Sequence, residues 1–172
     1  MENSFTITTS RFLMRQLNQD DVSERYLDWL NDNTAKKFIT AASQENSLSD
    51  LRRFIAEREN RSDVLFLGIF DLTTGLHIGN IKYEPVDSVK RYAVMGILIG
   101  DVHYRSKGVA GEVITASSIW LGKKRNVSQI LLGVHIDNMA AVKAYQNIGF
   151  EVTSSPHLSN KDSEGLIMKL EL

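Results

Sequence analysis

The sequence contains no cysteine and only two prolines among its 172 residues. Without cysteine there can be no disulfide framework, thiolate metal site or cysteine nucleophile, and a reducing compartment is the simpler expectation. The four histidines have no spacing typical of metal ligands, so we expect no metal site. The composition is 42% hydrophobic, with no low-complexity tract. It indicates a single domain over residues 1–172, large enough for a core and a ligand cleft.

Neither sign of charge is in excess, because 20 lysines and arginines face 21 aspartates and glutamates. This balance argues against nucleic acid as a partner, although a local basic patch could still hold one phosphate group. Apolar runs such as Ala93–Gly100 are too short to span a bilayer, and the N-terminus lacks a signal architecture. We therefore expect no membrane partner and a soluble, cytoplasmic protein.

Strand-like and helix-like segments alternate along the chain. Helices are expected over residues 18–32, 47–60, 108–124 and 138–150, and strands over 9–17, 63–71, 76–84, 91–100, 129–136 and 165–172. Gly75 is expected in a hairpin turn between two of these strands. The strand, helix and strand between residues 91 and 136 predict a parallel crossover. The order predicts an α+β fold with a mixed sheet.

Polar residues and glycines mark the ends of the expected helices. Asn18 or Asp20 is expected to cap the first helix, and Ser47 the second. The two later helices are expected to end at Gly122 and Gly149, since glycine readily adopts the left-handed conformation that closes many helices.

The segment Ile99–Ile114 starts as the end of an apolar strand and finishes as the start of a helix. A helix N-terminus offers unpaired N–H groups and a partial positive charge, which suit an anion. Gly108 and Gly111 let a ligand approach the backbone, while Arg105 or Lys107 can supply charge. The GxxxxGK[ST] and GxGxxG patterns are absent. A dinucleotide-binding domain is also disfavoured because its glycine loop would follow the first strand.

Two motifs in order, together with the segment Tyr26–Asp32, resemble the GNAT N-acetyltransferase superfamily over nearly the whole chain. The similar branch contains the ribosomal-protein alanine acetyltransferases and their sugar-modifying relatives. The resemblance implies a mixed, mostly antiparallel twisted sheet of six to seven strands, flanked by about four helices. The motif residues are Arg105, Gly108 and Ala110 in the first, and Asn138, Ala141, Tyr145, Gly149 and Phe150 in the second.

The resemblance also implies acetyl-CoA as co-substrate. Its pyrophosphate would bind the amides of Ser106–Gly111, and its pantetheine arm would lie beside the end of the preceding strand. The Arg105 side chain would either brace the turn or lie near the 3′-phosphate, and Asn138 would both cap a helix and contact the cofactor. The cofactor-binding residues so implied are Leu98, Ile99, Gly100, Arg105, Ser106, Lys107, Gly108, Val109, Ala110, Gly111, Asn138 and Tyr145.

In the family the position of Tyr145 lies by the thioester sulfur, which makes Tyr145 the expected general acid; the alternative is core packing. Many relatives carry a glutamate where this sequence has Met95 and Gly133. His135 lies on the same strand face as Gly133, and its ordinary pKa near 6.5 suits a base. A histidine hydrogen-bonded at a strand end is the alternative. Glu84 is a further candidate on the substrate side, with a solvated acid as its alternative.

The expected activity is direct N-acetyl transfer to a primary amine, since no thiol is present to form an acetyl-enzyme. The acceptor would be a small amine such as an aminosugar, or a peptide N-terminus. Trp29 would form a substrate wall or pack in the core, and Lys36 and Lys37 follow it in the loop. A non-catalytic acyl-CoA-binding module is the alternative. The oligomeric state stays open, a homodimer included.

Overall fold

The computed structural model describes residues 5–33, 47–159 and 163–172. The expected substrate loop with Lys36 and Lys37 lies outside these residues. The strands are β1 (Thr6–Thr8), β2 (Phe12–Gln16), β3 (Leu65–Asp71), β4 (His77–Asp87), β5 (Tyr92–Ile99), β6 (Gln129–His135), β7 (Glu151–Thr153) and β8 (Gly165–Glu171). The helices are α1 (Glu24–Asn31), α3 (Leu48–Ala56), α4 (Val109–Arg125) and α5 (Met139–Ile148), with short 3-10 turns at Gln19–Asp21 and Val102–Tyr104.

The eight strands form one sheet in the order β1-β2-β3-β4-β5-β6-β8-β7, in which only β5 and β6 are parallel. The predicted mixed, mostly antiparallel sheet and its parallel crossover are therefore confirmed. The predicted six to seven strands are too few. The expected first strand corresponds to β2, and its first residues form a tight turn in which the Thr9 N–H donates to the Phe12 carbonyl at 2.8 Å. The additional strands are β1, which precedes this turn, and short β7 at the opposite edge of the sheet.

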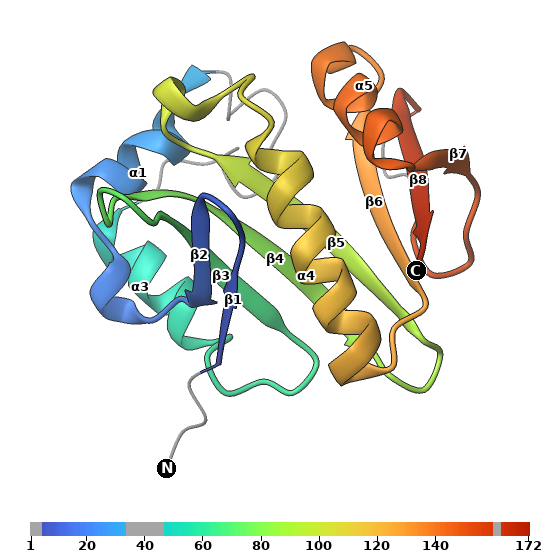
Figure 1. Ribbon diagram of the computed structural model, residues 1–172, viewed down its shortest axis with the longest axis horizontal. Coiled ribbons are helices and arrows are strands. Elements are labelled where there is room, and N and C mark those ends of the chain that lie inside the picture. Colours follow the sequence, from blue (N-terminus) through green and yellow to red (C-terminus); the bar gives the residue numbers. More distant parts are fainter. Residues whose placement is uncertain (1–4, 34–46, 160–162) are drawn as a thin grey trace.

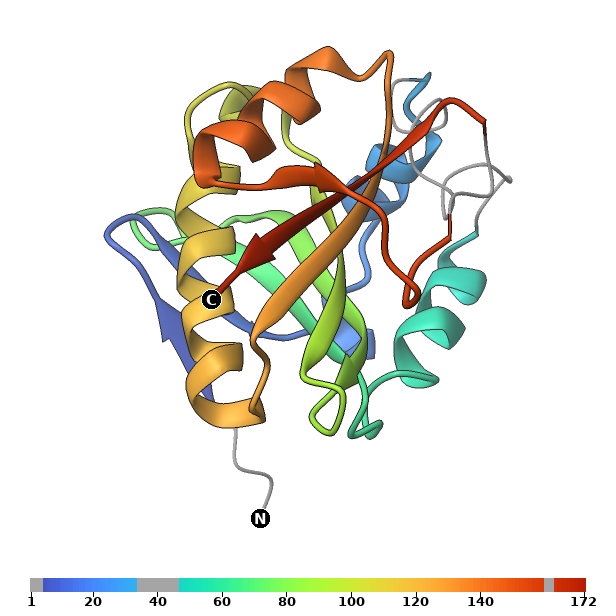
Figure 2. The same ribbon diagram turned by 90° about the vertical axis from the view of Figure 1, so that its right-hand side faces the viewer.

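Helices cover both faces of the sheet, with α4 on one face and α1 and α3 on the other (Figures 1 and 2). Alternation along β3 explains the two layers, because successive strand side chains point to opposite faces. Leu65 and Leu67 are buried in the cluster that contains α4, while Phe66 is buried in the cluster that contains α1 and α3. Within the described part of the chain, no helix is long and apolar enough to cross a bilayer.

The first two helices begin at serines. Ser47 caps α3 in the predicted capping box. The cap of α1 is Ser23, whose side chain accepts from the Tyr26 N–H, so the prediction of Asn18 or Asp20 is wrong. Asn18 instead caps the short 3-10 turn that precedes α1. The polar segment from Asn18 to Ser23 therefore contains two N-caps, one for the 3-10 turn and one for α1, where the sequence indicated one.

The ends of the later helices depend on left-handed residues. Gly149 closes α5 with φ +114°, as predicted. The predicted end of α4 at Gly122 is wrong, because the helix continues to Arg125 and closes at Asn126 with φ +55°. Asparagine adopts this conformation more readily than most residues with a side chain. Glycine alone therefore did not mark the helix end.

Strands β5 and β6 are paired only at their first three residues, from Tyr92 opposite Gln129 to Val94 opposite Leu131. Beyond these pairs the two strands diverge, as Figure 1 shows. The amide edge of β5 that faces β6 therefore has no partner strand beyond Val94. The turn into α4 follows the free end of β5.

Candidate active site

A cavity of about 1280 Å³ extends across the diverging ends of β5 and β6. One end is lined by the turn before α4 and by α5, and the other end by α1, α3, β3 and β4. Two glycines border its middle, Gly96 on β5 and Gly133 on β6, and a Cβ added at either one would meet nothing within 4 Å. The space beside these two glycines is therefore open where the strands separate.

The turn into α4 presents backbone N–H groups to this cavity. Ser106 and Gly108 both have left-handed backbones, with φ of +58° and +74°. Such alternation arranges successive N–H groups into an anion-binding concavity. Gly108 provides no side-chain cap, and the Glu112 N–H to Gly108 carbonyl bond (3.2 Å) spans the first turn of α4. The N–H groups of Val109–Gly111 precede it and can bind an anion.

Two arginines donate hydrogen bonds to backbone carbonyl groups that flank or belong to this turn. Arg105 donates from Nε to the Ile99 carbonyl and from Nη2 to the Gly100 carbonyl, both at 3.0 Å. Arg11, in the turn between β1 and β2, donates from Nη1 to the Lys107 carbonyl at 3.1 Å. Because C=O and N–H point in opposite directions across a trans peptide, fixing the Lys107 carbonyl aims the next N–H away from Arg11.

Glu112 fastens the β1–β2 turn to the first turn of α4. Its carboxylate accepts from Arg11 Nε at 2.7 Å, from the Arg11 N–H at 3.0 Å and from Ser10 Oγ at 2.9 Å. Burial alone would raise the pKa of Glu112, but hydrogen bonds from Thr9, Arg11 and Ser10 outweigh it and lower the pKa to about 2. Arg11 was not predictable as part of this site, because its partners Glu112 and Lys107 lie about a hundred residues away in the sequence.

Tyr145 and Asn138 both line the cavity, as the cofactor assignment requires. The Tyr145 ring lies 5.7 Å from the ring of Phe150, and burial raises the pKa of its hydroxyl to about 12. The phenol is therefore protonated at neutral pH. The Asn138 side chain accepts from the Ala141 N–H at 3.4 Å and so caps α5.

His135 also lines the cavity, and both of its ring nitrogens have partners. Nδ1 accepts from the Asp137 N–H at 3.2 Å, and Nε2 lies 3.2 Å from a Glu164 carboxylate oxygen. A neutral ring held in this way has no free lone pair, because Nδ1 accepts and Nε2–H donates. Ligand atoms of these three residues lie within 4.8 Å of one another, a grouping that the sequence did not indicate.

Four expected site residues do not line the cavity: Trp29, Gly100, Lys107 and Glu84. Trp29 is 7% exposed, and a Cβ at Gly100 would lie 1.9 Å from Trp29 Cδ2, so the indole packs in the core against this glycine. Of the two alternatives for Trp29, the structure supports core packing and not the substrate wall. Gly100 and Lys107 contribute the carbonyls that Arg105 and Arg11 bind.

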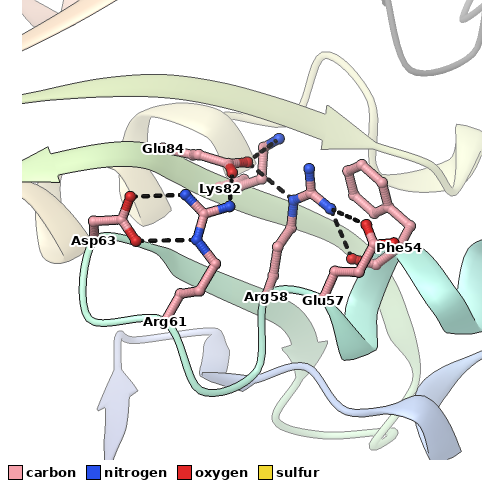
Figure 3. A network of polar contacts seen from close by, with 7 residues as sticks. All are labelled: Phe54, Glu57, Arg58, Arg61, Asp63, Lys82 and Glu84. Atoms are coloured by element: carbon pink, nitrogen blue, oxygen red, sulfur yellow. Dashed lines mark hydrogen bonds and ion pairs between the residues drawn. The ribbon is translucent and has the colours of Figure 1, made fainter.

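Glu84 is likewise not at the cavity wall, and the expected solvated acid is in fact bound by three cations (Figure 3). Its oxygens lie 2.9 Å from Lys82 Nζ, 3.0 Å from Arg58 Nε and 2.7 Å from Arg61 Nη1. Burial raises the pKa of Glu84, but Lys82 and Arg58 outweigh it and lower the pKa. Lys82 lines the cavity instead. Strand alternation places it on the same face as Glu84, a signal that could have found it.

A family model described as an acetyltransferase (GNAT) domain matches residues 11–151. The chain belongs to the GNAT acetyltransferase family. The predicted membership of the GNAT superfamily is thereby confirmed. The mycothiol acetyltransferase of Renibacterium salmoninarum is 30% identical over 126 residues, which are 71% of this chain and 36% of that protein. The chain thus spans about a third of that relative's length.

Solved GNAT structures are similar over nearly the whole chain. RimL, a ribosomal L7/L12 alpha-N-protein acetyltransferase in complex with coenzyme A, has a TM-score of 0.82 at 12% identity, covering 98% of both chains. The spermidine N-acetyltransferase of Vibrio cholerae, in complex with CoA and spermine, has a TM-score of 0.78 at 18% identity, covering 94% of this chain and 96% of that one. At such low sequence identity the structural similarity shows the fold alone, and it confirms the predicted GNAT-like architecture.

The residues of this GNAT domain fit acetyl-CoA. A pyrophosphate needs amide donors without side-chain caps, which the turn at Ser106–Gly111 supplies. A long thioester arm needs a groove, and the cavity between β5 and β6 provides one. Of the twelve cofactor-binding residues that the resemblance implied, all but Gly100 and Lys107 line this cavity.

Proposed function

We propose that this chain is an N-acetyltransferase that moves the acetyl group of acetyl-CoA directly to a primary amine. The observation that supports it most is the turn into α4, whose left-handed backbone opens onto the same cavity as Tyr145. In this proposal the amides of Ser106–Gly111 hold the pyrophosphate. Leu98 and Ile99 form the wall beside the pantetheine arm, and Asn138 contacts it from the opposite side.

When bound, acetyl-CoA supplies an acetyl group activated by its thioester, with a thiolate as leaving group. The N–H groups on the free edge of β5 beyond Val94 can donate to a carbonyl oxygen that gains negative charge. Tyr145 holds a proton at neutral pH. Complete proton transfer from a phenol of pKa about 12 to a thiolate of ordinary pKa is uphill by roughly 5 kcal/mol. Tyr145 therefore acts by donating a hydrogen bond to the leaving sulfur.

The acceptor amine must lose a proton before it attacks. The two positions at which many relatives carry a glutamate hold Met95, which is buried and apolar, and Gly133, which has no side chain, so neither position supplies a carboxylate. We propose His135 as a base only after its bond from the Asp137 N–H opens, since that bond occupies the Nδ1 lone pair. Replacing His135 should then reduce the rate only modestly.

Thiol release from acetyl-CoA tests the proposal, with a panel of aminosugars, polyamines, amino acids and short peptides with free N-termini. Calorimetric titration of CoA is run beside it. Amine-dependent release with a tight CoA complex is the expected result. Tight CoA binding without turnover of any amine would favour the non-catalytic acyl-CoA-binding module instead.

A further inference from the structure

Lys82 occupies an open position in the acceptor end of the cavity. On β4 it pairs with Phe66 of β3 on one side and with Gly96 of β5 on the other. Neighbouring strands lie about 4.8 Å apart, so Lys82 is one strand from the place where β5 and β6 separate. Because Gly96 has no side chain and nothing lies near its Cβ position, the space beside Lys82 is open.

The charge of Lys82 is only partly neutralised. Its side chain is 28% exposed, and its Nζ lies 2.9 Å from Glu84 and 5.1 Å from the centre of the Phe54 ring. The same Glu84 carboxylate also binds Arg58 and Arg61 (Figure 3). These two arginines have second carboxylate partners in Glu57 and Asp63, whereas among the described residues Lys82 is paired with Glu84 alone. An ammonium has three N–H donors, and among the described residues only Glu84 accepts one of them.

The acids of the cavity wall are already engaged. Asp50 is bound by Ser47 and Arg53, which lower its pKa, and Glu57 lies 3.6 Å from an Arg58 nitrogen. The third carboxylate nearby, Asp63, binds Arg61 and does not line the cavity. No described acid of the wall is therefore left over to receive Lys82.

We propose that Lys82 binds an anionic group, a carboxylate or a phosphate, on the acceptor amine. This inference rests on the proposed function and names the class of its acceptor. A half-buried ammonium with two donors to spare forms strong charge-assisted hydrogen bonds with such a group. It also repels a second cationic amine, so polyamines are poor acceptors.

Matched acceptor pairs test this inference by the ratio of their kcat/KM values. The pairs are glucosamine 6-phosphate against glucosamine, and alanine against alaninamide, which separate a phosphate from a carboxylate; spermidine serves as the dication. The wild type should favour the anionic member of at least one pair by about tenfold to a hundredfold, as one charge-assisted hydrogen bond implies. Lys82→Met should bring that ratio close to one, and Lys82→Arg should keep most of it.

The chain offers a matched control in Lys169 on β8. Its side chain is 32% exposed, and its Nζ lies 2.6 Å from the glutamate two residues further on, as in Lys82 with Glu84. Lys169 does not line the cavity. Lys169→Met removes the same charge and the same kind of ion pair, so the acceptor ratio should not change.

A wild-type preference for the neutral amines or for spermidine would overturn the inference, and so would an unchanged ratio in Lys82→Met. Titration of N-acetylglucosamine 6-phosphate and N-acetylalanine into the CoA complex separates this result from a failure of catalysis. If no amine reacts but Lys82→Met abolishes binding of an anionic product, the anion subsite stands and the proposed function fails. If no amine reacts and neither compound binds, both are overturned.

Discussion

Replacing Gly108 by alanine should separate cofactor binding from folding, because a matched glycine exists elsewhere in the chain. Gly108 has φ +74° and Gly75, in the β3–β4 turn, has φ +71°. A left-handed backbone costs a residue with a side chain about 1–2 kcal/mol. At 2–4 °C per kcal/mol for a chain of this size, each variant should lose about 2–8 °C in Tm. No atom crowds either Cβ position closer than 3.8 Å, so strain is the main cost.

The two variants should differ in their affinity for CoA. Strain at Gly108 turns the amides at the start of α4 away from their anion-binding arrangement. Each charge-assisted hydrogen bond lost costs about 1.5–3 kcal/mol. Losing one of them raises the Kd for CoA by about tenfold to a hundredfold. Gly75 does not line the cavity, so Gly75→Ala should bind CoA like the wild type.

Calorimetric titration of CoA, paired with thermal unfolding of both variants, measures this difference. Equal losses in Tm with a weaker CoA complex in Gly108→Ala alone would support the assignment. If Gly108→Ala binds CoA as tightly as Gly75→Ala does, the turn into α4 is not the pyrophosphate site.

The remaining predictions concern four side chains. Arg11→Ala should raise the Kd for CoA about tenfold, because it removes the hydrogen bond that holds the Lys107 carbonyl. Arg15→Ala is the control: it removes an ion pair between β2 and Asp21 and should leave the Kd unchanged. Equal effects of the two variants in CoA titrations would contradict the role of Arg11. Tyr145→Phe should lower kcat at least about tenfold with an unchanged Kd for CoA, and a wild-type rate would remove its role. His135→Gln should keep kcat within about threefold, and a loss of about a hundredfold or more would instead establish His135 as the base. Glu112→Gln should lower the free energy of unfolding at pH 7. Because the pKa of Glu112 in the folded protein is about 2, against an ordinary 4.5, the difference in free energy between wild type and variant should vanish as the pH falls from 4.5 towards 2. Chemical denaturation across this pH range measures it.

Features built from neighbouring residues were predictable from the sequence. The turn at Ser106–Gly111 and the helix starting at Asn138 depend on local glycine and capping chemistry, and both were predicted. The crossover between β5 and β6 followed from the order of strand, helix and strand. Local order was enough to predict the turn and the helix start that line one end of the cavity, whereas their assignment to acetyl-CoA came from the family resemblance.

Features built from distant residues were not predictable. The bond from Arg11 to Glu112 joins positions 101 residues apart, and no local pattern marks it. Helical spacing indicated core packing as one alternative for Trp29, but its partner Gly100 could not be named from the sequence of α1, because their contact depends on how α1 crosses the sheet. Strand alternation puts Lys82 and Glu84 on one face, but the arginines that share Glu84 come from the segment after α3.

Acetyl-CoA labelled in its acetyl group distinguishes direct acetyl transfer to an amine from CoA binding alone. If this GNAT domain transfers acetyl groups to amines, the label appears on the nitrogen of an amine in step with the release of CoA thiol, and never on the protein. A CoA complex that forms while the label stays on CoA with every amine would contradict direct transfer.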